Sequence, residues 1–99
     1  MDQPDQTIHQ PMRLKIMAAL RPLPASEKLE FVRLKELVGA TDGNLGAHVT
    51  TLEDAGYIAV EKDFAGKKPR TRVALTKTGR RAFAEYTDYL REIIDVAHG

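Results

Sequence analysis

Residues 67–72 hold the densest group of side chains that can bind an anion. This stretch reads Lys-Lys-Pro-Arg-Thr-Arg and contains no acidic residue, whereas the whole chain of 99 residues has a net charge of only +1. A cationic cluster on a nearly neutral protein favours contact with a specific anionic partner over general adhesion to anions. The alternative interpretation is a charged loop that contacts only solvent.

Other kinds of chemistry find little support in the sequence. The chain has no cysteine, which excludes a disulfide scaffold, a cysteine-based zinc site and a cysteine nucleophile. No Ser/His/Asp set or carboxylate pair stands out, and residues 65–68 lack the spacing of a phosphate-binding loop. No carboxylate or histidine recurs at metal-ligand spacing around His9 or His98, which we expect at the surface. We therefore expect no catalytic residue, no metal and no cofactor.

Composition and length indicate one globular domain over residues 1–99. Hydrophobic residues make up 42% of the chain and charged residues 29%, which is ordinary for a globular protein. The longest uninterrupted apolar run, residues 16–20, is far shorter than the roughly 20 residues that a membrane span needs. The acidic, polar start at residues 1–5 is unlike a secretory signal. We expect a cytoplasmic protein with no membrane partner.

Three helices are predicted in the first half of the chain. Pro11 opens a helix over residues 12–20, because proline is tolerated in the first helical turn. A very short strand at residues 29–31 precedes a second helix over residues 32–38, which groups three apolar side chains: Leu34, Leu37 and Val38. Thr41 caps a third helix over residues 42–55, whose inward stripe is Leu45, Val49 and Leu52. A turn of about three residues at 39–41 joins the second and third helices, which is typical of a helix-turn-helix.

A hairpin and a long helix are predicted in the second half. Residues 57–64 and 70–75 alternate as strands do, and the loop between them at 65–69 contains Gly66 for a tight bend. Thr76 then caps a helix over residues 77–96 with one broad apolar side. The predicted hairpin thus has a cationic tip.

This order resembles the small winged helix-turn-helix transcriptional regulators related to the MarR and ArsR repressors. Five fragments carry the resemblance, which covers about residues 8–83: Pro11-Met12-Arg13-Leu14-Lys15-Ile16, Leu34-Lys35-Glu36-Leu37, the run from Thr41 to Ile58, Phe64-Ala65-Gly66-Lys67-Lys68-Pro69-Arg70-Thr71, and Leu75-Thr76-Lys77-Thr78-Gly79-Arg80. The resemblance implies an α+β, mostly α, fold. It has a three-helix core and a β-hairpin wing within residues 8–76, followed by a long C-terminal dimerisation helix at 77–97.

The resemblance further implies duplex DNA as a partner, with the helix at 42–55 in the major groove and the wing at 65–72 on the phosphates. The residues expected to contact DNA are Thr41, Asp42, Gly43, Asn44, Ala47, His48, Thr50, Thr51, Lys67, Lys68, Arg70 and Arg72. A packing role for His48 is as plausible as a phosphate contact. The helix departs from the family because it has no lysine or arginine, so the wing must supply the attraction. Four wing cations in each subunit of a dimer predict a salt slope of roughly −7.

The last helix predicts a symmetric dimer. A three-helix core cannot cover an apolar stripe of this length, and an exposed stripe of this kind usually marks an interface. The residues expected there are Met12, Ile16, Phe83, Tyr86, Tyr89, Leu90, Ile93, Ile94 and Ala97. Such a dimer would read a pseudo-palindromic operator with half-sites about 10 base pairs apart.

Two further hypotheses accompany the regulator, which is most simply a repressor that blocks promoter access. In the first, the chain is a winged-helix protein-interaction module with little DNA affinity, as the acidic Asp42, Glu53 and Asp54 suggest. In the second, a small-molecule effector binds in a cleft between the DNA-binding core and the dimer helices, with Tyr86 and Tyr89 in one wall.

Overall fold

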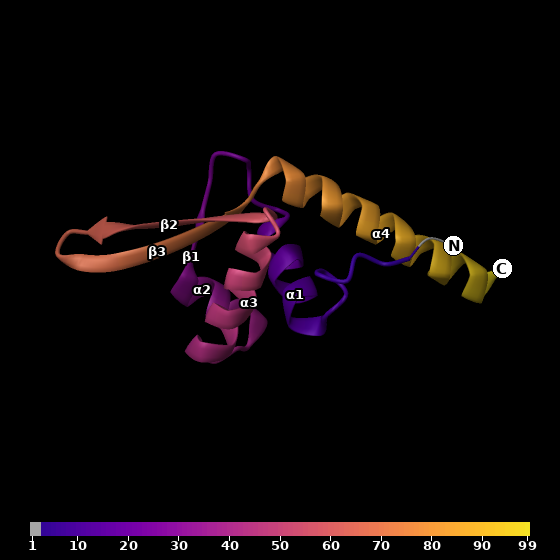
Figure 1. Cartoon of the computed structure of the whole chain (residues 1–99), viewed down its shortest axis with the longest axis horizontal. Coiled ribbons are helices and arrows are strands. Elements are labelled where there is room, and N and C mark those ends of the chain that lie inside the picture. Colours follow the sequence, from indigo (N-terminus) through magenta and orange to yellow (C-terminus); the bar gives the residue numbers. More distant parts are fainter. Residues whose placement is uncertain (1–2) are drawn as a thin grey trace.

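Helices and a hairpin follow one another in the predicted winged-helix order in the computed structural model, which describes residues 3–99 (Figure 1). The elements are α1 (Pro11–Leu20), β1 (Leu29–Glu30), α2 (Phe31–Val38), α3 (Asp42–Asp54), β2 (Ile58–Ala65), β3 (Lys68–Leu75) and α4 (Lys77–His98). The fold is an α+β winged helix, as the sequence predicts. The wing is the β2–β3 hairpin.

Local capping explains where the helices begin and end. The side chain of Gln10 accepts a hydrogen bond from the backbone of Arg13 at the start of α1, and Thr41 does the same for Asn44 at the start of α3. Gly39 ends α2 with a φ of 68°, in the left-handed region that favours glycine. These contacts satisfy backbone groups that a helix end leaves unpaired, and they confirm the turn predicted between α2 and α3.

The core lies where α1, α2 and α3 pack against the root of the wing and the first half of α4. Its fully buried side chains include Ile16, Leu34, Leu45, Leu52 and Val73. Leu37, which the sequence groups with Leu34 and Val38, is 51% exposed. An eight-residue helix turns only Leu34 and Val38, one helical turn apart, toward the core.

Ile8 is a core residue that the sequence reasoning missed. It is fully buried, although it comes from the N-terminal segment before α1. Asp5 holds this segment in a turn, because its Oδ1 accepts hydrogen bonds from the backbone of Thr7 at 2.9 Å and of Ile8 at 3.2 Å. The segment therefore belongs to the folded domain.

The sheet has three antiparallel strands in the order β1-β3-β2. β2 and β3 pair along their whole length, from Ile58↔Leu75 to Ala65↔Lys68. The predicted loop at 65–69 is therefore too long: only Gly66 and Lys67 form the turn, and Lys68 and Pro69 belong to β3. Gly66 has a φ of 66°, as the first central residue of a tight hairpin turn requires.

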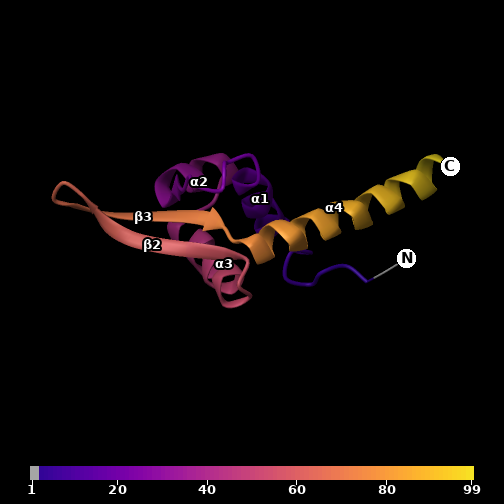
Figure 2. The same cartoon turned by 90° about the horizontal axis from the view of Figure 1, so that it is seen from above.

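The wing and α4 project from the core in opposite directions (Figures 1 and 2). The molecule measures 56 × 26 × 21 Å, with these two elements along its longest axis. The N-terminal segment runs beside α4 (Figure 2). No helix in the described part of the chain is long and apolar enough to cross a membrane.

Candidate nucleic-acid interface

One side of α3 is exposed at the surface of the protein. Leu45, Val49 and Leu52 are buried, as predicted. The opposite side exposes small or uncharged side chains: Gly43, Asn44, Ala47, Thr50 and Thr51. A surface of this kind allows a close approach to a groove of duplex DNA, and asparagine can read adenine by two hydrogen bonds.

Three predicted contact residues at α3 already have partners within the chain. Thr41 Oγ1 accepts a hydrogen bond from the Asn44 backbone at 3.2 Å, and Thr51 Oγ1 donates to the Ala47 carbonyl at 3.1 Å. Asp42 Oδ1 lies 2.8 Å from Lys35 Nζ. This ion pair offsets the acidic charge at the exposed start of α3.

His48 lies at the edge of α3, where it meets a cation from α1. Its Nδ1 is 3.2 Å from Arg13 Nη1, and Arg13 Nε donates to the Thr7 carbonyl at 2.5 Å. His48 is half-buried, so it has a packing role within the chain. Arg13 is a cation beside α3 that is not among the residues predicted to contact DNA.

The outer face of the wing, opposite the helices, carries a network of ion pairs. Arg70 binds Asp63 in two-point fashion, with Nε 2.9 Å from Oδ1 and Nη2 2.8 Å from Oδ2. Arg72 contacts Asp63 at 3.0 Å and also pairs with Glu61, which in turn pairs with Lys28. Hydrogen bonds from Arg70 lower the pKa of Asp63 to about 2, and those from Lys28 and Arg72 lower the pKa of Glu61.

Arg70 and Arg72, which the sequence predicts to contact phosphate, are both paired with carboxylates of the same hairpin. Residues 67–72 contain no acid along the chain, but the register places Asp63 opposite Arg70 and Glu61 opposite Arg72. Cross-strand neighbours of opposite charge attract each other. The two arginines therefore neutralise carboxylates of β2.

The inner face of the wing, on the side of the helices, carries a cation that the prediction missed. Successive side chains of a strand alternate between faces, so Lys62 and Phe64 lie on the same face as the buried Ile58 and the half-buried Val60. Lys62 is exposed. It lines a groove of about 260 Å³ between α3 and the wing, together with Phe31, Gly46, Val49, Thr50, Glu53, Val60 and Thr71. The alternation from Ile58 was the signal that could have identified it.

Lys62, Lys67 and Lys68 form no ion pair within residues 3–99, in contrast to the two arginines. All three are exposed; Lys67 lies in the turn of the wing and Lys68 directly follows it. The cations available to an outside anion are thus the lysines of the inner face and the tip.

The wing and α4 meet at a tightly packed root. Thr76 Oγ1 donates to the Gly56 carbonyl at 2.6 Å and accepts from the Gly79 backbone at 2.9 Å. The Thr76 backbone donates to the Tyr57 carbonyl at 3.1 Å. A Cβ on Gly79 would overlap that same carbonyl, which explains the glycine in the fragment at 75–80.

The apolar stripe of α4 divides into a buried and an exposed part. Phe83 and Tyr86 pack on their own core, as does Ile16 of α1, so these three predicted interface residues offer little or no surface to a second subunit. Met12, Tyr89 and Leu90 are half-buried, whereas Ile93, Ile94, Ala97 and also Val96, which the prediction omitted, are exposed. The surface left for a partner lies at the end of α4.

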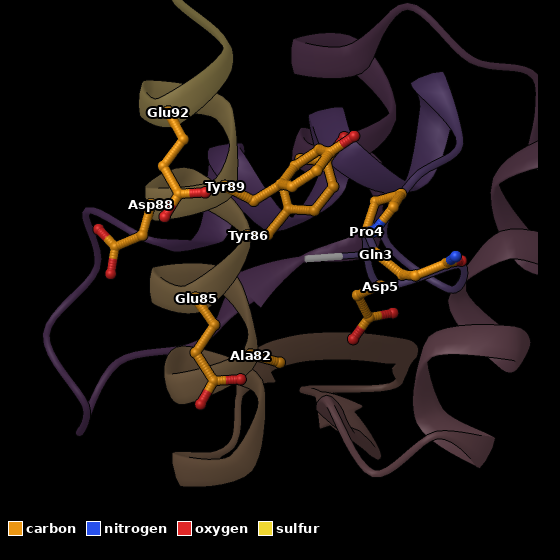
Figure 3. Close-up of a pocket in the computed structure, with 9 residues that line it drawn as sticks. All are labelled: Gln3, Pro4, Asp5, Ala82, Glu85, Tyr86, Asp88, Tyr89 and Glu92. Carbon is orange, nitrogen blue, oxygen red and sulfur yellow. The ribbon is translucent and has the colours of Figure 1, made fainter. Parts of the chain in front are cut away.

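A cavity of about 440 Å³ lies between α4 and the N-terminal segment (Figure 3). Tyr86 and Tyr89 both line it, as do four carboxylates: Asp5, Glu85, Asp88 and Glu92. The Tyr86 hydroxyl lies 2.8 Å from His9 Nδ1, and burial raises the pKa of Tyr86. No group of three or more potential metal ligands occurs among residues 3–99.

Comparisons with known proteins agree with this geometry. The profile of a family described as a winged helix DNA-binding domain matches residues 12–94. An uncharacterized protein of Methanocaldococcus jannaschii is 39% identical over 75 residues, which cover 76% of this chain and 78% of that protein. A transcriptional regulator homologue of Pyrococcus horikoshii superposes with a TM-score of 0.84 at 30% identity, covering 94% of this chain and 89% of the other.

More distant structures share the fold. A MarR family transcriptional regulator from Silicibacter pomeroyi has a TM-score of 0.68 at 24% identity; the match covers 89% of this chain and 56% of that one. The transcriptional repressor BigR from Xylella fastidiosa has a TM-score of 0.62 at 19% identity, covering 88% of this chain and 80% of the other. The profile match and the two archaeal relatives show that the chain belongs to the winged helix DNA-binding domain family.

Proposed function

We propose that the chain is a single-domain, cytoplasmic, dimeric transcriptional repressor that binds duplex DNA in a sequence-specific manner. One observation carries the proposal: Thr50 from the uncharged side of α3 and the free cation Lys62 line the same groove. A helix that enters the major groove and a cation that holds the adjacent phosphate need this arrangement.

In the proposed complex, α3 lies in the major groove with its N-terminal half toward the bases. Asn44 is placed to read adenine and Thr50 to contact a thymine methyl group or a phosphate. Lys62, Lys67 and Lys68 hold the phosphate backbone. Because α3 carries no lysine or arginine, the wing supplies most of the affinity and α3 most of the sequence preference.

The dimer in this proposal is formed by the end of α4. The exposed fractions of Ile94 and Val96 are 53% and 71%, and a contiguous apolar surface of this kind is stabilised when a second copy covers it. A two-fold dimer presents two copies of α3 to successive major grooves, about 10 base pairs apart. It therefore favours a pseudo-palindromic operator.

The salt dependence of binding tests the proposal. Three free wing lysines in each subunit, six in a dimer, predict a slope of log affinity against log salt of roughly −5, because each neutralised phosphate contributes about −0.9. Ten wing cations, with Arg70 and Arg72 included, would give roughly −9. The measurement is fluorescence anisotropy of a 30-base-pair mixed-sequence duplex between 50 and 300 mM salt.

A triple variant tests whether the wing lysines cause that salt dependence. Lys62→Ala/Lys67→Ala/Lys68→Ala should weaken binding to every duplex and reduce the slope toward zero. The matched control, Lys15→Ala/Lys77→Ala/Arg81→Ala, removes three exposed cations outside the wing and should leave most of the slope. Equal losses in the two variants would contradict the assignment of the wing.

A protein-interaction module is the second candidate. The ion pairs of Arg70 and Arg72 favour it, because they remove two wing cations from contact with phosphate. Retention on heparin or on random duplex DNA at low salt separates the two functions. A wild-type chain that is not retained would favour the protein-interaction module and contradict DNA binding.

A small-molecule effector belongs to the regulator proposal. The cavity lined by Tyr86 and Tyr89 lies between the N-terminal segment and α4, and its four carboxylates favour a cationic over an anionic compound. Thermal shift with an aromatic amine and an aromatic acid of equal size tests this, since only the amine should raise the Tm. A larger shift with the acid would contradict it.

A further inference from the structure

The tip of the wing carries an exposed aromatic side chain that neither the fold nor the ion-pair network uses. Phe64 is 67% exposed and lies opposite Pro69 across the hairpin. With Ala65 and Lys68 as the pair next to the turn, ladder alternation makes Phe64–Pro69 a non-hydrogen-bonded pair, in which side chains are closest. At such a position the backbone N–H does not bond to the paired strand, so the proline, which lacks an N–H, loses no hydrogen bond of the hairpin. The Phe64–Pro69 pair is thus an apolar point at the tip.

This point lies on the face of the wing that is turned toward α3. Phe64 and Pro69 share that face with Lys62 and Thr71, which line the groove beside α3. Asp63, Arg70 and Arg72 lie on the other face, where they neutralise one another. The apolar tip therefore has cations beside it and no carboxylate on its own face of the tip, which suits a narrow groove walled by phosphates.

The length of the wing fits the spacing of DNA grooves. In B-DNA, the adjacent minor groove lies roughly half a turn, about 17 Å, from the centre of a major groove. A helix occupies about 5 Å of that distance on each side of its axis, which leaves about 12 Å. Phe64 lies two residues beyond Lys62, about 7 Å along the strand, so its aromatic side chain has to span the remaining distance of about 5 Å. Lys62 then lies at the phosphates between the two grooves.

We propose that Phe64, supported by Pro69, enters the minor groove next to the major groove that holds α3 and partly unstacks one base step there. The inference rests on the proposed function and names how the wing contributes to sequence preference. Phenylalanine and proline are among the side chains that act as such wedges. Unstacking costs least at pyrimidine–purine steps such as TA, so the wing selects flexible steps that it does not read by hydrogen bonds.

Two matched probes test the wedge. Both are 30-base-pair duplexes of equal A·T content in which the regions flanking the centre contain either repeated TA steps or continuous A-tracts. The wild-type chain should bind the TA duplex about tenfold more tightly than the A-tract duplex, and Phe64→Ala should reduce this ratio to about one. Phe64→Leu, which keeps an apolar side chain, should retain part of it.

Base unstacking has a direct optical readout. A 2-aminopurine placed next to a TA step should become more fluorescent when the wild-type chain binds, and not when Phe64→Ala binds. Leu37→Ala is the matched control, since Leu37 is also about half exposed but lies on α2; it should behave as the wild type. Circular dichroism of each variant checks that the fold is kept.

The possible failures are distinguishable. Salt-dependent binding that loses its slope in the lysine triple variant but is unchanged in Phe64→Ala would overturn the wedge and leave DNA binding intact. An equal loss on both duplexes, without a change in 2-aminopurine fluorescence, would also overturn it. No binding of the wild-type chain at low salt would overturn the proposed function and the wedge together.

Discussion

The wing and α4 leave the core in opposite directions and expose opposite kinds of surface. The outer part of the wing presents lysines around one aromatic side chain, whereas the last turns of α4 present aliphatic side chains. Near the core, however, they behave alike. Val73 and Leu75 of the wing and Phe83 and Tyr86 of α4 are all buried.

The difference between root and tip explains why each element is longer than the fold requires. In the wing, the residues nearest the core are buried in it, and Asp63 and Arg70 further out form ion pairs. Within the described chain, the residues of the tip do neither. In α4, the core uses the first three turns and the apolar surface continues beyond them. The side chains that the protomer leaves exposed here lie at the far ends of the two elements. An anionic partner would cover the lysines of the wing tip, and an apolar partner would cover the end of α4.

The largest expected effect comes from the root that the two elements share. Gly79→Ala places a Cβ on the Tyr57 carbonyl, and because neither backbone can move without shifting the wing or α4, we expect a loss of about 3 kcal/mol. Gly46→Ala is the control: its Cβ would meet nothing within 4 Å, and helix propensity predicts a gain of up to about 1 kcal/mol. Urea denaturation measures both, and equal effects would show that the root is not tightly packed.

Breaking the tip of α4 should affect assembly without affecting the fold. Ile93→Glu/Ile94→Glu places two charges on an exposed apolar surface, so the dimer should dissociate while the Tm of the protomer changes little. Loss of the second subunit should lower DNA affinity by about a hundredfold, because the two half-sites no longer act together. Sedimentation velocity and anisotropy measure the two effects.

The control for this variant is Val32→Glu/Leu37→Glu, which alters two exposed apolar residues of α2. It should keep the mass and the affinity of the wild type. If the wild-type chain is a monomer at all concentrations used for DNA binding, the role given to the end of α4 is wrong.

Releasing Arg70 of the wing should have a smaller effect of the opposite sign. Asp63→Asn removes the carboxylate that holds Arg70, whereas Arg72 keeps its pair with Glu61. Affinity for mixed-sequence DNA should rise about tenfold at low salt, and the salt slope should move from roughly −5 toward −7 as Arg70 of each subunit reaches phosphate. Asp88→Asn, on α4, removes an equal charge outside the wing and should leave the slope unchanged. A slope that stays the same in Asp63→Asn would show that Arg70 faces away from the DNA even when free.

The pH dependence of the wing follows from the same pair. The pKa of Asp63 is lowered to about 2 from an ordinary 3.8, so its contribution to stability is fully present above pH 3.8 and is lost as pH falls through 2. The NMR chemical shift of the Arg70 side-chain Nε–H should therefore remain constant down to about pH 3 and change below it. A midpoint near 4 would show that the pair does not form in solution.

Much of this arrangement was predictable because it depends on local patterns. The stripe of α3, the caps at Thr41 and Thr76 and the stop at Gly39 follow from residue types a few positions apart. Pairing across the hairpin does not follow from such local patterns. Whether Arg70 faces solvent or Asp63 depends on the register, which a two-residue turn sets. Residues 67–72 contain no acidic residue, but the folded hairpin places carboxylates of β2 beside their arginines.

Packing between distant segments was equally hidden from the sequence. A helical pattern shows that Phe83, Tyr86 and Ile93 share a side of α4, but not where the core beneath them ends. Ile8 was missed for the same reason, because it precedes the first recognisable helix; Lys62, by contrast, could have been identified from the alternation that begins at Ile58. Tertiary contacts decide which of these side chains are buried.

The smallest predicted effect concerns the hydrogen bond that ties the N-terminal segment to the root. The Tyr57 hydroxyl donates to Asp5 Oδ2 at 2.5 Å, and this hydrogen bond is the main reason why the pKa of Tyr57 is raised from 10.0 to about 12. Tyr57→Phe should lower the free energy of unfolding by about 1 kcal/mol at neutral pH. A raised pKa contributes stability that is fully present below pH 10 and disappears as pH rises through 12. The stability difference between wild type and variant should therefore shrink over that interval, which urea denaturation from pH 8 to 12 measures.

Tyr89→Phe, for which the described chain provides no hydroxyl partner, is the control and should change stability by less than about 0.5 kcal/mol. A constant difference up to pH 12 would mean that Asp5 does not hold Tyr57, and that the N-terminal segment is anchored to the domain by Ile8 instead.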